Sequence, residues 1–115
     1  MGRKKKGRRR DAEVSPPELS GIALLLSQMP AATLDLHGLT AEQAERRLRS
    51  FLTTQARVST GKVLHIITGK GTRSEGQPVL PGVVRRLLDG ELADWVTEVA
   101  GLPGGGGVAV RVAEP

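Results

Sequence analysis

Asp35 and His37 are the residues in this sequence whose types and spacing are best suited to acid–base chemistry. They lie in the segment 34–38, Leu-Asp-Leu-His-Gly, where an apolar, strand-like run gives way to a turn. Strand residues two apart point to the same face, so the carboxylate and the imidazole should leave the strand end together. Imidazole titrates near neutral pH and can move protons, while a carboxylate can orient the ring, favour its charged form or hold a cation. A structural role, in capping the next helix or fixing the turn, is the commoner explanation of an isolated Asp-x-His pair.

A second polar motif, Thr-Gly-Lys-Gly at 68–71, follows the clearest apolar run of the chain. Its glycines would let backbone amides approach an anion, and Lys70 would supply a point charge; an ordinary tight turn is the alternative. The motif is not a nucleotide P-loop, because Gly71 stands where Ser or Thr is needed and Leu64 where the earlier Gly is needed. Nor is it a dinucleotide fingerprint, because Ser74 occupies the last glycine position. Parallel strand ends meet at one sheet edge, so the two motifs together predict a phosphate site there.

The elements that must position these motifs follow from periodicity and from capping boxes that begin at Ser15 and Thr40. We expect a short amphipathic helix or linker in 15–30, strands at 33–36, 62–68, 95–100 and 108–112, and helices at 41–57 and 80–88. The fold class is therefore α/β in the sense of an α+β two-layer protein, with the order β-α-β-α-β-β. The first two strands should be parallel, and two helices should cover one face of a mixed four-stranded sheet.

Several side chains on these elements carry more specific expectations. Acid-first i,i+4 spacing predicts two ion pairs on the 41–57 helix, Glu42 with Arg46 and Glu45 with Arg49. His65 lies inside a strand and is interpreted as structural. The 15–30 segment should either cover the apolar surface of the domain or dock a partner, and its spacing places on one face Leu19, Ile22, Leu25 or Leu26, and Met29.

Charge and composition limit the classes of function. The chain has 115 residues, which suits one domain, here 31–113. The first ten residues carry seven of the 17 Lys and Arg residues and no acid, so the rest of the chain has a formal charge of −2. We expect 1–14 to be a disordered tail that binds a polyanion (RNA, DNA or a ribosome) or only aids solubility, and the tail cations are Arg3, Lys4, Lys5, Lys6, Arg8, Arg9 and Arg10. The absence of Cys excludes thiolate zinc sites and thiol nucleophiles. With no membrane-length apolar run or secretory signal, a cytoplasmic monomer is predicted.

The segment 34–40 followed after one helix by 66–71 resembles the Smr (small MutS-related) domain, as does Arg-Ser-Glu-Gly at 73–76. The resemblance covers about residues 31–112 and is greatest to the short stand-alone bacterial members. It implies a fold similar to the C-terminal domain of translation initiation factor 3 and an endonuclease acting on DNA or RNA. It ties Asp35 and His37 to cleavage, and Gly69, Lys70 and Gly71 to nucleic acid. Many members carry His where this chain has Thr68, which leaves His37 as the only motif histidine.

The predicted site therefore combines a catalytic pair, Asp35 and His37, with a phosphate-binding set made of Gly38, Thr68, Gly69, Lys70, Gly71, Arg73 and Ser74. Two chemistries stay open: metal-free attack by the 2′-hydroxyl of RNA, or attack by water on DNA with a divalent metal such as Mg²⁺ or Mn²⁺. The alternatives are a non-catalytic module that binds RNA, DNA or the ribosome, and a nuclease delivered by a partner through the helix in 18–29. Base recognition should be poor, since Phe51 and Trp95 are the chain's two aromatic residues.

Overall fold

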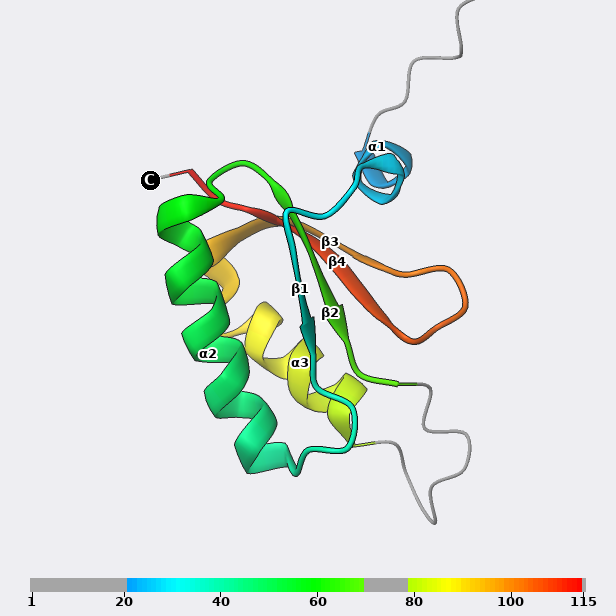
Figure 1. Cartoon of the computed structure of the whole chain (residues 1–115), viewed down its shortest axis with the longest axis vertical. Helices are drawn as coiled ribbons and strands as arrows, with labels where there is room; N and C mark the ends of the chain where they lie inside the picture. The colour runs from blue at the N-terminus through cyan, green and yellow to red at the C-terminus, as the bar shows by residue number, and fades with distance from the viewer. Residues whose placement is uncertain (1–20, 70–78, 115) are drawn as a thin grey trace, which may run out of the picture.

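The computed structural model describes residues 21–69 and 79–114 (Figure 1). Predictions for the basic tail, for the capping box at Ser15 and for the loop that contains Lys70, Gly71, Arg73 and Ser74 lie outside these residues. The described elements are α1 (Gly21–Ser27), β1 (Ala32–Asp35), α2 (Ala41–Val58), β2 (Val63–Ile67), α3 (Leu80–Asp89), the short 3-10 helix η1 (Ala93–Trp95), β3 (Val96–Gly101) and β4 (Gly107–Val112).

The four strands form one mixed sheet in the order β1-β2-β4-β3. β1 and β2 are parallel, with Asp35 beside Ile67, and α2 connects them. β4 is antiparallel to both of its neighbours, β2 and β3. The predicted element order and the mixed four-stranded sheet are confirmed. The near-continuous apolar run of β2 lies inside the sheet, between β1 and β4, as such a run indicates.

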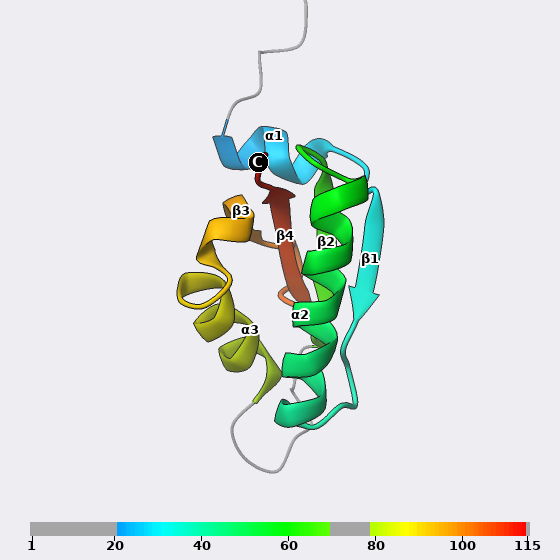
Figure 2. The same ribbon diagram turned by 90° about the vertical axis from the view of Figure 1, so that its left-hand side faces the viewer.

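α2 and α3 cover the same face of the sheet (Figures 1 and 2). The main core lies beneath them, and its side chains include Leu48 and Leu52 of α2, Leu87 of α3, and Leu64 and Ile66 of β2. Full burial of one such side chain contributes about 1.5–3 kcal/mol. The layer of aliphatic side chains therefore fixes how β1 and β2 lie beside each other, and with them the positions of both strand ends.

α1 lies on the opposite face, against β3 and β4 (Figure 2). Its Leu25 is fully buried with Val63 and Ala109, as expected if the helix covers apolar surface of the domain. Ile22 and Met29 were expected on the same apolar face but are exposed. The helix ends at Ser27, so Met29 falls outside the helical repeat that the spacing predicted.

α2 begins at the predicted capping box. The Thr40 hydroxyl accepts from the Gln43 backbone N–H at 3.1 Å, and Gln43 Oε1 accepts from the Thr40 N–H at 3.0 Å. These two bonds satisfy donors that the first turn of a helix leaves open. They also fix the point at which the chain turns from the end of β1 into α2.

One of the two predicted ion pairs on α2 forms. Arg49 Nη2 lies 3.3 Å from Glu45 Oε1, and Glu45 also accepts from Arg86 of α3. Arg46 makes no contact within 4.0 Å with Glu42 among the described residues, so that part of the prediction is wrong. An exposed pair gains too little in water to hold two long side chains together, whereas Glu45 has two partners.

None of the described helices is both long and apolar enough to cross a membrane.

Candidate active site

Asp35 and His37 are in direct contact at the carboxyl end of β1. Asp35 Oδ1 lies 2.7 Å from His37 Nδ1 and accepts from the His37 backbone N–H at 3.0 Å. An ionised carboxylate can only accept, so the shared hydrogen belongs to Nδ1. In the neutral ring, Nε2 then carries the lone pair. The contact thus sets one tautomer of the imidazole and leaves its basic nitrogen on the side away from Asp35.

The electrostatics of the pair favour an ionised Asp35. The hydrogen bond from the His37 ring, followed by the bond from its backbone N–H, lowers the pKa of the Asp35 carboxyl below its usual range. The His37 and Asp35 side chains are 69% and 55% exposed, so a polymer can reach both. Leu34, just before Asp35, and Leu36, between the two residues, are buried in the core. The two buried leucines therefore hold this strand end on the core, while Asp35 and His37 face solvent.

The turn after His37 depends on a glycine. Gly38 has a φ of 83°, a left-handed conformation that glycine adopts without the cost of a Cβ. The Leu39 N–H donates to the Leu36 carbonyl at 3.1 Å and closes the turn. Gly38 therefore shapes the backbone between the Asp35–His37 pair and α2.

The second motif reaches the first one through Gly69. A Cβ built on Gly69 would lie 3.4 Å from the Cβ of His37, and the Leu36 N–H donates to the Ile67 carbonyl at 2.7 Å. The parallel strand ends thus bring together Asp35, His37 and Gly69. Lys70, Gly71, Arg73 and Ser74 lie outside the described residues.

Two groups of this motif are bound internally. The Gly69 N–H donates to the Gly106 carbonyl at 3.1 Å, so this amide is engaged, in contrast to the expectation that it would face an anion. Thr68 is buried, and its hydroxyl donates to the Gly69 carbonyl at 3.1 Å. In this arrangement the described part of the motif has a structural role, because these two groups bond to the protein's own backbone.

The partner of this motif is the end of the glycine-rich hairpin between β3 and β4. The Gly106 carbonyl accepts from the N–H groups of both Thr68 and Gly69. At Gly107 an added Cβ would lie 2.2 Å from the Ile66 carbonyl oxygen. The run of glycines just before a strand was the available signal for this close approach.

Arginines lie on both flanks of the site. Arg46 and Arg47 of α2 line a hollow of about 170 Å³ with Leu39 and Gln43. On the other flank, Arg85 of α3 lines a hollow of about 200 Å³ that also includes Thr68. The sequence placed Arg46 in an ion pair with Glu42 and gave Arg47 and Arg85 no role, although Gln43, Arg46 and Arg47 have the i, i+3, i+4 spacing of one helical face.

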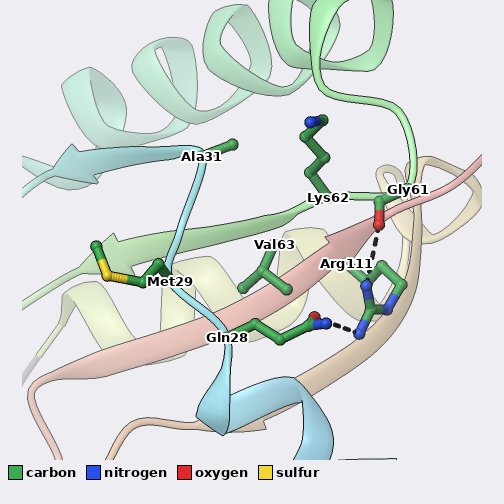
Figure 3. Close-up of a pocket in the computed structure, with 7 residues that line it drawn as sticks. All are labelled: Gln28, Met29, Ala31, Gly61, Lys62, Val63 and Arg111. Atoms are coloured by element: carbon green, nitrogen blue, oxygen red, sulfur yellow. Dashed lines mark hydrogen bonds between the residues drawn. The ribbon is translucent and has the colours of Figure 1, made fainter.

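A further hollow, of about 310 Å³, lies at the other end of the sheet, beside the start of β2 (Figure 3). Its Arg111 guanidinium donates to Glu98 at 2.6 Å, to the Gly61 carbonyl at 2.9 Å and to Gln28 Oε1 at 2.8 Å. Lys62 points away from this guanidinium (Figure 3). Arg111 thus connects the sheet to Gln28, just after α1. Lys62 and Arg111 do not point toward one common ligand.

Metal ligands are sparse near the pair. No group of three or more His, Cys, Asp or Glu side chains suited to a metal occurs within 21–69 and 79–114. Asp35 Oδ1 is engaged by His37, which leaves Oδ2 as one hard oxygen ligand. Mg²⁺ is commonly held by one or two carboxylates together with substrate phosphates. One carboxylate oxygen fits that pattern, so Asp35 could supply a protein ligand in the metal-assisted chemistry.

The Smr domain family model matches residues 34–112, which run from β1 to the end of β4. This chain belongs to the Smr domain family. A relative from Treponema pallidum (strain Nichols), named only as an uncharacterized protein, is 42% identical over 68 residues. That match covers 59% of this Smr protein and 33% of the relative, so it spans about a third of the relative's length. Functions in the family are related to nucleic acids.

Proposed function

We propose that this Smr protein is an endonuclease that cleaves phosphodiester bonds in RNA or DNA. The observation that carries the proposal is the 2.7 Å contact between Asp35 Oδ1 and His37 Nδ1 at an exposed strand end. A carboxylate that fixes the tautomer of an accessible imidazole is an arrangement suited to general acid–base catalysis. A turn-fixing role alone would not require an exposed Nε2.

In the RNA reaction, His37 Nε2 takes the proton from a 2′-hydroxyl. The 2′-oxygen attacks the neighbouring phosphorus, the bond to the 5′-oxygen breaks, and the departing 5′-oxygen takes a proton from water, which yields a 2′,3′-cyclic phosphate and a 5′-hydroxyl. Asp35 holds the ring and stabilises the imidazolium that forms. Lys70 and the Gly71 amide, on the chain just after Gly69, are proposed to stabilise charge on the phosphoryl oxygens. In the DNA reaction, water replaces the 2′-hydroxyl and a divalent metal assists.

The decisive experiment compares parental protein, His37→Ala and Asp35→Asn on matched RNA and DNA duplexes, hairpins and single strands, with and without EDTA. We expect His37→Ala to lower kcat by about 10²–10⁴, and Asp35→Asn to lower it by a smaller factor. Thr33→Ala is the matched control, because Thr33 is an exposed polar residue two positions earlier on β1.

Three outcomes separate the alternatives. Cyclic phosphate ends formed in the presence of EDTA support the metal-free RNA reaction, whereas cutting that EDTA abolishes supports the metal-assisted one. Cutting by His37→Ala at the parental rate removes the assignment of the catalytic residue. Tight binding of nucleic acid without cleavage by any of the proteins identifies a non-catalytic binding module.

A further inference from the structure

The charges on the helical face of this protein are not evenly balanced. Two arginines, Arg49 and Arg86, are neutralised by carboxylates, since Glu45 contacts both. Arg46 and Arg47 make no contact within 4.0 Å with a carboxylate among the described residues. Arg57, in the last turn of α2, likewise has no such contact, so two of these three arginines lie together in the first two turns, where Arg46 and Arg47 line the 170 Å³ hollow.

This hollow offers hydrogen-bond donors and no acid. Its lining consists of the two guanidinium groups, Gln43 and the apolar Leu39. Gln43 Oε1 is already used by the Thr40 N–H, so the side chain has its NH₂ donors left for a ligand. A volume of 170 Å³ equals that of about six water molecules in the liquid, which leaves room for one tetrahedral anion. Forked guanidinium donors match phosphate oxygens in pairs.

The hollow is connected to the Asp35–His37 pair by the short closed turn before α2. Leu39 follows His37 by two residues across the closed turn, and Figure 1 shows α2 starting at the same end of the sheet as the carboxyl end of β1. Arg47 lies about 10 Å along the helix axis from Thr40, at a rise of 1.5 Å per residue. Phosphates of one strand in a duplex follow each other every 3.4 Å or so along the axis.

We infer that Arg46, Arg47 and Gln43 form a phosphate subsite for the substrate strand, separate from the bond that is cut. The inference rests on the proposed function for the position of that bond, and it makes the preferred ligand a polynucleotide chain. The proposed contact is with the sugar-phosphate backbone, because paired guanidinium donors match phosphate oxygens.

The test measures binding of labelled 20-nucleotide RNA and DNA, single-stranded and duplex, to the full chain carrying His37→Ala so that no cutting occurs. We expect Arg46→Ala/Arg47→Ala to weaken binding about tenfold at 150 mM salt and to reduce the slope of log K against log salt by about 1.4–1.8, the value for two lost contacts. Arg57→Ala in the same background is the control, since Arg57 is an exposed arginine on α2 about 15 Å further along the axis. It should change affinity less than twofold.

Cleavage provides the second measurement. With His37 intact, the double variant should raise KM and leave kcat within twofold, because a remote backbone contact is made equally in the ground state and the transition state. Equal affinities and salt slopes for the double variant and Arg57→Ala overturn the inference, as does a full chain that binds no polynucleotide. Binding that shows the expected difference in a protein that never cuts overturns only the nuclease proposal.

Discussion

His65 is a single residue that lowers the stability of this fold. Its Nε2 is shielded from solvent and has no hydrogen-bond partner among the described residues. A buried polar atom without a partner costs about 1–3 kcal/mol, which an apolar replacement avoids. We expect His65→Val, which also suits a strand, to raise the free energy of unfolding in urea by about 1 kcal/mol. Cleavage should not change, and a large loss of activity would mean that His65 belongs to the active site.

Gly107 is a second residue whose identity the packing dictates. A Cβ there would lie 2.2 Å from the Ile66 carbonyl oxygen and 3.0 Å from the Ile67 Cα. Gly107→Ala should therefore force β4 away from β2 and lower the free energy of unfolding by about 1–3 kcal/mol. Gly106→Ala is the matched control, because a Cβ on Gly106 meets nothing within 4 Å. Equal urea midpoints for the two variants would contradict this account.

At the scale of elements, Glu45 joins α2 to α3. Hydrogen bonds from Arg86 and then Arg49 lower the pKa of Glu45, so its contribution to stability is present above the ordinary value of about 4.3 and is lost as the pH falls through the folded value. Glu45→Gln should lower the urea midpoint at pH 7, and the difference from the parental protein should shrink as the pH falls below the ordinary pKa of about 4.3. Glu42→Gln, on the same helix, should have no effect. A Glu45→Gln deficit that persists unchanged at pH 2.5 would rule out the ion pairs as its cause.

The elements themselves could be predicted from sequence because their signals are local. Alternation placed Leu34 and Leu36 in the core, and the capping box placed the start of α2 at Thr40. The fate of the Gly69 amide could not be predicted, because its acceptor, the Gly106 carbonyl, comes from a distant hairpin. The hollow at Arg46 was missed for a similar reason. Helical spacing shows that side chains share a face. Only the fold shows which of these side chains are neutralised by carboxylates.

At the scale of the whole molecule, the basic tail should affect the affinity for nucleic acid, and the folded domain should set kcat. Seven cations in the first ten residues can each release a counterion on binding a polyanion, whereas the proposed chemistry belongs to the strand ends of the domain. Replacing residues 1–10 by an equally long Gly-Ser segment should therefore reduce the salt slope of binding by up to about six. The kcat at saturating substrate should be unchanged, as measured by single-turnover and steady-state cleavage across a salt series. Shuffling the order of residues 2–10 is the control and should preserve affinity, because counterion release depends on charge and not on sequence. A tail replacement that abolishes kcat would place tail residues within the catalytic site itself.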